Sequence, residues 1–159
     1  MPVLWHSRSS QRGLILRKLV FPIAIAASML VAQPAWAEIG RVKTFVGEVS
    51  IQRGTARFPA RAGFVLEKGD VVRTGKGGRV GIAFQDNTRF AIGPASTITL
   101  SEFTYDRARQ TGSFVTQVNR GSLGVVSGRI AKSGRDAMRV RTPTSMLGVR
   151  GTKFVVEVK

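Results

Sequence analysis

The residue types that most often carry catalysis near neutral pH are nearly missing from this sequence. The chain of 159 residues contains no cysteine, and its one histidine is His6. Without cysteine there is no thiolate nucleophile and no cysteine zinc site. If the segment that holds His6 is removed, as argued below, histidine bases, histidine metal sites and Ser-His-Asp triads are excluded as well. No serine has a lysine three positions on, which excludes Ser-x-x-Lys chemistry.

A glycine-rich run and nine acidic residues are the remaining candidates for chemistry. Residues 75–78 (GKGG) lack the Gly-x-x-x-x-Gly-Lys-Ser/Thr pattern of a phosphate-binding loop and lie between two strand patterns, so we interpret them as a turn. The nine acids are scattered, which argues against a calcium site and singles out no glycosidase pair. Asp70 and Asp86 lie in turn-like positions where carboxylates accept backbone N–H bonds. The sequence therefore predicts a protein that is not an enzyme and has no cofactor or metal site.

The first 37 residues have the pattern of a secretory signal peptide. Four basic residues and no acid precede an uncharged run over 19–32, and Ala35-Trp36-Ala37 gives the small-x-small pattern that a signal peptidase accepts. The uncharged run is shorter than the roughly 18 to 20 residues that a membrane-spanning helix needs. We therefore expect the general secretion route, cleavage after Ala37, no transmembrane anchor after cleavage, and a periplasmic or secreted domain over 38–159.

The predicted mature segment is strongly basic. The whole chain carries a formal charge of +16, and because four of its 25 basic residues and none of its nine acids precede residue 38, residues 38–159 carry +12. In an envelope compartment a positive surface meets acidic partner proteins, anionic lipid headgroups or polysaccharide. Export argues against nucleic acid as the partner.

Apolar and polar residues alternate through most of 38–159. Val80, Ile82 and Phe84 are separated by small or charged residues, and the same period of two recurs over 89–92, 97–101, 138–141 and 153–159. This period is typical of strands with one buried face. Residues 102–110 also fit alternation, and we interpret them as strand. With turn residues every 8 to 12 positions, the sequence predicts a single all-β domain of about ten to twelve short strands.

The clearest hairpin signal is Asp86-Asn87 between Phe84 and Phe90. Asparagine tolerates the positive φ that a primed two-residue turn demands. Periodicity leaves open whether the strands stack as a solenoid or fold over as a sandwich or roll.

Three separated motifs resemble the FecR-domain family, the periplasmic β-module of ferric-citrate-type transmembrane signalling regulators. They are residues 69–75 (GDVVRTG), residues 84–90 with 94–96 (FQDNTRF and PAS), and residues 141–143 with 148–154 (RTP and GVRGTKF). The resemblance covers about residues 40–159. It implies a twisted, solenoid-like β-domain, with a sandwich or roll as the alternative, that works by protein contacts rather than by chemistry.

The departures from the family indicate the module in a stand-alone, secreted form. Full regulators carry a cytoplasmic anti-sigma segment, and the 18 residues before the apolar run are too few to fold as one. Direct control of a sigma factor is therefore not expected, and the association with iron uptake comes from the family resemblance alone.

The motif residues are interpreted mainly as structural or interaction residues. They are Gly69, Asp70, Arg73, Thr74, Gly75, Asp86, Asn87, Thr142, Pro143, Gly148, Arg150, Gly151 and Thr152. We expect Pro143 to end strand pairing or to lie at an edge. Because a buried charge needs a partner, we hypothesise an ion pair between Asp70 and Arg150; the alternative is that both are solvated.

Five arginines alternate with apolar residues within strands and are candidates for one basic sheet face: Arg73, Arg79, Arg89, Arg139 and Arg141. This face is interpreted either as a solvated surface that keeps the protein soluble or as a docking surface for an acidic partner or an anionic envelope polymer. The sequence thus favours a non-enzymatic exported protein-interaction module in envelope signalling or regulation. The alternative is a binding protein for an anionic envelope glycan or lipid.

Overall fold

The computed structural model describes residues 37–159, so the predicted signal peptide falls outside the described residues except for Ala37. The strands are β1 (Glu38–Val46), β2 (Val49–Arg53), β3 (Ala56–Pro59), β4 (Val65–Glu67), β5 (Val71–Thr74), β6 (Arg79–Phe84), β7 (Arg89–Ile92), β8 (Thr97–Asp106), β9 (Thr111–Val126), β10 (Met138–Arg141), β11 (Met146–Val149) and β12 (Lys153–Val158). One helical turn, α1 (Ile130–Ser133), precedes β10. The predicted all-β fold of about ten to twelve strands is confirmed.

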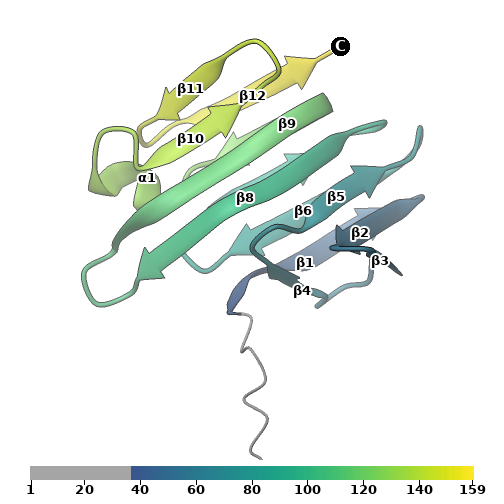
Figure 1. The fold of residues 1–159 in the computed structure, drawn as a ribbon, viewed down its shortest axis with the longest axis horizontal. Helices are drawn as coiled ribbons and strands as arrows, with labels where there is room; N and C mark the ends of the chain where they lie inside the picture. The colour runs from purple at the N-terminus through teal and green to yellow at the C-terminus, as the bar shows by residue number, and fades with distance from the viewer. Residues whose placement is uncertain (1–36) are drawn as a thin grey trace, which may run out of the picture. The chain divides into compact units, whose positions relative to one another are not determined.

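Strand β9 joins two layers of one curled sheet (Figure 1). Its residues 111–120 pair with β8, and its residues 121–126 pair with β12. We call the order β12-β9-β7-β6-β1-β4 layer I, and the order β3-β2-β5-β8-β9-β10-β11 layer II. Among the described strands every pair is antiparallel except β9 with β10. This arrangement is the roll that was the alternative to a solenoid.

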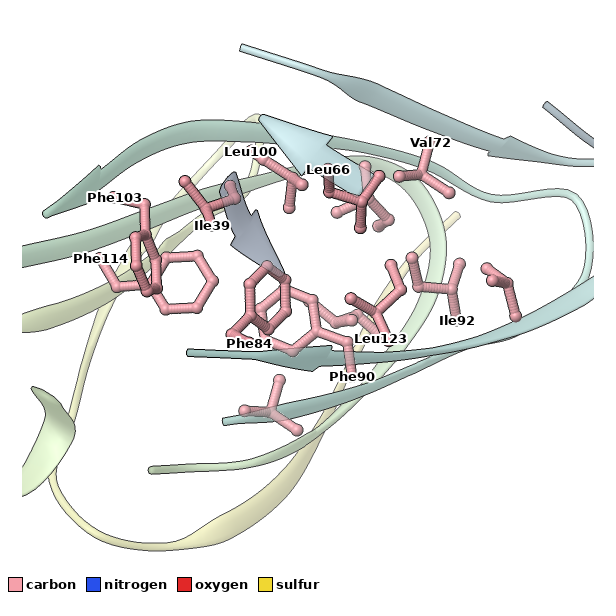
Figure 2. Packing of buried hydrophobic residues seen from close by; sticks show 14 of the residues in the cluster. Ile39, Leu66, Val72, Phe84, Phe90, Ile92, Leu100, Phe103, Phe114 and Leu123 are labelled. Atoms are coloured by element: carbon pink, nitrogen blue, oxygen red, sulfur yellow. The ribbon is translucent and has the colours of Figure 1, made fainter. Parts of the chain in front are cut away.

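The core lies between the two layers and is built from the alternating apolar positions. Phe84 and Phe90 of layer I meet Phe114 of layer II, with ring centroids 4.7 and 5.4 Å apart (Figure 2). Phe114 is fully buried, and Phe103 packs edge-on against it at 5.0 Å. Aromatic pairs in such tilted and stacked arrangements add to the stabilisation from burial. The period of two therefore identified the buried face of each strand correctly.

Three of the crossings between the layers lie at one corner, where polar side chains and glycines replace the apolar core. Thr74 Oγ1 donates a hydrogen bond to the carbonyl of Gly93 (2.7 Å) and accepts one from the N–H of Ser96 (2.9 Å). The N–H of Ser122 donates to Ser96 Oγ (3.0 Å). Next to it Gly121 has φ +87°, and a Cβ there would overlap with Ser96. Because three crossings contact one another here, backbone groups that leave the strands are still hydrogen-bonded.

The run 75–78 is a turn from β5 to β6, as predicted. The N–H of Gly75 donates to the carbonyl of Glu48 (2.9 Å), and the carbonyl of Gly75 accepts from the N–H groups of Gly78 (3.0 Å) and Ala95 (2.9 Å). These bonds tie the turn to the neighbouring crossings, so Gly75 has a structural role at this corner.

Two local predictions need correction. The β6–β7 hairpin has a loop of three residues, 85–87, because the N–H of Phe84 donates to the carbonyl of Thr88. Asn87 has the expected positive φ of 68°, but the two-residue turn was wrong. Strand β8 ends at Asp106, so residues 107–110 form a turn rather than strand. The Asp106 carboxylate accepts the N–H groups of Ala108 and Arg109, which explains the turn.

Candidate functional site

The Asp70 carboxylate is fully buried, and its charged partner is Arg53. Arg53 Nε donates to Asp70 Oδ1 and one terminal nitrogen donates to Oδ2, both at 2.8 Å. The N–H of Glu67 also donates to Oδ2 (2.9 Å). The hypothesis of an Asp70–Arg150 pair was therefore wrong: both carboxylate oxygens are bonded to Arg53, and Arg150 is exposed between β11 and β12.

Arg53 joins the end of β2 to the β4–β5 corner. Its second terminal nitrogen donates to Glu67 Oε1 (2.6 Å), and the carbonyl of Val65 accepts a further bond (2.9 Å). The hydrogen bond to Asp70, together with attraction by the Asp70 and Glu67 carboxylates, raises the pKa of Arg53 above its already high ordinary value against the opposing effect of burial. All of these guanidinium donors are bonded inside the fold, so this cluster is structural.

Asp86 is also fully buried, and backbone N–H and hydroxyl groups bind its carboxylate. Its Oδ1 accepts from the N–H of Thr88 (3.1 Å), and its Oδ2 accepts from the Thr88 hydroxyl (2.7 Å) and from the N–H of Ile130 (3.3 Å). The Thr88 hydroxyl accepts in turn from the N–H of Gly128 (3.0 Å). Asp86 therefore fixes the segment between β9 and α1 to the β6–β7 hairpin.

Substitution Asp86→Ala is expected to lower the free energy of unfolding by about 2 to 3 kcal/mol, because it leaves buried N–H groups of the hairpin and of residue 130 without an acceptor. The measurement is urea unfolding followed by far-UV circular dichroism. Lys76→Ala, at an exposed position of the 75–78 turn, is the control and should change stability by less than about 0.5 kcal/mol. A similar loss of unfolding free energy for both variants would contradict the structural role of the Asp86 carboxylate.

The carboxy-terminal motif holds the last three strands in place. The N–H of Thr142 donates to the carbonyl of Ser145 (2.8 Å), and Thr142 Oγ1 accepts from the N–H of Ser145 (3.0 Å). This turn contains Pro143 and separates β10 from β11, so the expectation that Pro143 ends strand pairing is confirmed. The carbonyl of Thr152 accepts from the N–H (3.2 Å) and hydroxyl (2.9 Å) of Ser127.

Three motif glycines lie at turns or close approaches. Gly69 has φ +89° before Asp70, and Gly151 has φ +63° in the turn from β11 to β12. A Cβ on Gly148 would overlap with the Asp136 carboxylate. These positions are consistent with the structural interpretation of the motif.

The five candidate arginines do not form one basic face. Arg79 and Arg89 lie on layer I, whereas Arg73, Arg139 and Arg141 lie on layer II. Arg73 and Arg139 are only half-exposed, and Nε of Arg139 is buried. Alternation within a strand tells which side faces outward, but it does not tell which layer the strand joins. This part of the prediction was therefore wrong.

The structure instead places a shallow apolar trough on the outer face of layer I. Its floor is the register row Gly81, Ala91 and Gly124, which carries a single methyl group, and the Thr44 side chain lies beside Gly81. Two adjoining hollows of about 440 and 380 Å³ lie over this row. Exposed apolar side chains rim them: Phe45 (42% exposed), Val46 (64%), Val126 (39%) and Val155 (74%).

Cations border the same trough. Arg79 lines one hollow, and Arg89 and Lys153 line the other. Strand register connects a further row across the layer, from Arg41 through Ala83, Arg89 and Val126 to Lys153. Sequence reasoning missed Arg41 and Lys153, because only the pairing of strands distant in sequence puts them in line with Arg89.

The described part of the chain offers little else that suggests chemistry. Within residues 37–159 no group of three or more histidine, cysteine, aspartate or glutamate side chains is placed to hold a metal ion. Over the same range no helix is both long enough and apolar enough to cross a membrane.

A family model with the description FecR protein matches residues 70–159, which is more than half of the 159-residue chain. The match begins at the buried Asp70 and runs through the C-terminal strand β12. No curated protein and no solved structure matches the chain.

Proposed function

Because the chain belongs to the FecR family, we propose that it is a non-enzymatic, exported protein-interaction module of envelope signalling, and that the layer I trough is its contact surface. The observation that carries the proposal is an open apolar sheet face on layer I that is bordered by exposed cations. Asp70, Asp86 and Thr74 are all engaged in bonds that hold the fold. These three side chains are therefore not available to a partner, and we place the contact on the outer surface.

The chemistry of the trough favours an acidic protein segment with apolar side chains. Arg79, Arg89 and Lys153 are exposed around it, whereas Glu157 is the acid on the outer side of β12. Apolar rim residues supply contact area that excludes water, and charges at the rim select partners of opposite sign. Exposed apolar groups gathered on one face are typical of interaction surfaces.

The cation row supports a second candidate, an anionic envelope glycan or lipid. Arg89 lies two strands from Arg41 on one side and two strands from Lys153 on the other, so at about 4.8 Å per strand successive cations stand roughly 10 Å apart. A polyanion lying across the strands would meet these cations in turn. Arg41 is partly neutralised by Glu38, to which it donates at 2.6 and 2.7 Å.

The test is capture from cell-envelope extracts with the purified protein and two variants. Ala91→Glu places a charge in the trough floor, and Ser101→Glu places the same charge on β8 of layer II. We expect a defined protein to be retained by the wild type and by Ser101→Glu, and retention to fall about tenfold with Ala91→Glu. Equal retention by both variants would contradict the proposed surface.

The salt dependence of binding distinguishes a protein partner from an anionic glycan or lipid. A glycan or lipid held through the cation row should be recovered as polysaccharide or lipid, with an affinity that falls steeply between about 50 and 300 mM salt. A protein held partly by the apolar rim should lose much less affinity over this range.

A further inference from the structure

Strand β12 is the last strand of layer I, and one of its edges has no partner among residues 37–159. Its other edge pairs with β9 in the register Phe154–Val125 and Val156–Leu123. An open cleft of about 580 Å³ lies between residues 155–159 and the 142–145 turn with Leu147 of β11. Because no described strand pairs with the second edge of β12, its backbone groups are available to a further strand.

The hydrogen bond from the N–H of Ser127 to the carbonyl of Thr152 (3.2 Å) fixes which backbone groups are free. In an antiparallel pair each residue directs both its N–H and its C=O to the same neighbour, and the direction alternates along the strand. Thr152, Phe154 and Val156 thus direct theirs toward β9. Lys153, Val155 and Glu157 direct theirs to the free edge.

The side chains of these same three residues are exposed on the outer face of layer I. Val155 is 74% exposed, the largest value among the exposed large apolar residues of the described chain. The order Lys153, Val155, Glu157 reads cation, apolar, anion. An identical strand running in the opposite direction presents the complementary order.

We propose that β12 pairs with β12 of a second copy of this chain, antiparallel about a two-fold axis at Val155. Val155 then lies opposite its own counterpart, and Lys153 of each copy lies opposite Glu157 of the other. The backbone groups that this pairing requires are the ones left free by β9. Layer I becomes continuous across the two copies. This inference does not rest on the proposed function, because self-association needs no envelope partner.

The charge pattern selects this register over its neighbours. Moving the partner strand by two residues in one direction places Lys153 opposite Lys159, and like charges directly opposite one another are destabilising. Moving it the other way places Lys153 opposite Val155 and leaves both charges without their partners. A long edge with exposed valine is also a known liability for non-specific pairing, which a closed two-fold dimer removes.

The experiment is analytical ultracentrifugation of the purified protein and of charge variants. The wild type should form a dimer. Glu157→Lys and Lys153→Glu each replace two opposite-charge pairs with two like-charge pairs, and each should weaken the dimer by about tenfold or more. Lys76→Glu, in the exposed 75–78 turn, is the control and should leave the dimer unchanged. Unchanged circular dichroism of each variant excludes unfolding as the cause.

Two rescue measurements make the proposal specific. The double variant Lys153→Glu with Glu157→Lys should dimerise like the wild type, and an equimolar mixture of the two single variants should form a heterodimer. Because the chain has no cysteine, Val155→Cys should give one intermolecular disulfide on mild oxidation, since paired Cα atoms about 5.5 Å apart can be bridged. A monomeric wild type, or a dimer that Glu157→Lys does not weaken, would overturn the proposal.

Discussion

Replacing Arg53 with methionine is expected to lower the free energy of unfolding by about 3 kcal/mol, although Arg53 lies outside the matched family range. The substitution leaves the fully buried Asp70 carboxylate with the N–H of Glu67 and removes its charged partner. Breaking a buried pair by removing one member costs about 3 to 5 kcal/mol, and the lower end applies because the Arg53 side chain is 31% exposed. Urea unfolding followed by far-UV circular dichroism measures the loss.

The matched control for this variant is Arg57→Met on the neighbouring strand β3. Arg57 is exposed, so its loss should change stability by less than about 0.5 kcal/mol. Adding Asp70→Asn to Arg53→Met removes the uncompensated charge, and we expect it to recover part of the loss. If Arg53→Met and Arg57→Met are equally stable, the ion pair does not hold the β4–β5 corner.

The raised pKa of Arg53 determines how its contribution depends on pH. A group whose pKa is higher in the folded state stabilises the fold fully below its unfolded pKa, and the stabilisation is lost only as pH rises through the folded pKa. For Arg53 that window lies in strongly alkaline solution, because hydrogen bonding to Asp70 raises its pKa from an already high value. Arg53 therefore stays charged at neutral pH, and its contribution to the free energy of unfolding does not change with pH in that range.

The choice of partner for Asp70 shows where sequence reasoning stops. Alternation identified the buried positions of β6 and β7, because a strand of period two needs no information beyond its own residues. The need of Asp70 for a cation also followed from elementary electrostatics. The identity of that cation did not, since Arg53 approaches Asp70 only after β2 pairs with β5 and the chain between them folds back. Nothing local to Arg53 distinguishes it from the exposed arginines nearby.

Local sequence patterns also could not predict that the five candidate arginines lie on different layers, or that the trough forms on layer I. Whether Arg89 lies beside Arg41 or beside Arg73 depends on which layer β7 joins, and that depends on the path of the chain through the corner at Gly121. The glycines of the motifs were interpreted as structural residues, yet the contacts that require them come from residues far apart in the sequence. Gly121 itself was not among the candidate residues.

Gly121→Ala is expected to destabilise the fold by about 3 kcal/mol, because this glycine combines two constraints. Its φ of +87° costs an L-residue about 1 to 2 kcal/mol, and its Cβ would overlap with Ser96, which is buried at the same corner. Overpacking of that kind adds about 1 to 3 kcal/mol. The overlap cannot relax freely, since Ser96 is hydrogen-bonded to both Thr74 and Ser122.

Gly63→Ala separates the two constraints in the same protein. Gly63 has a similar φ of +82° but nothing within 4 Å of the position of its Cβ. Its substitution by alanine should therefore lower the free energy of unfolding only by the cost of the positive φ. The difference between the two variants, measured by urea unfolding with circular dichroism, then reports the contact with Ser96. Equal losses would mean that the corner yields to a methyl group and that β9 does not need glycine to pass from one layer to the other. A larger loss of unfolding free energy at Gly121 would show that close packing against Ser96 is needed where β9 passes from one layer to the other.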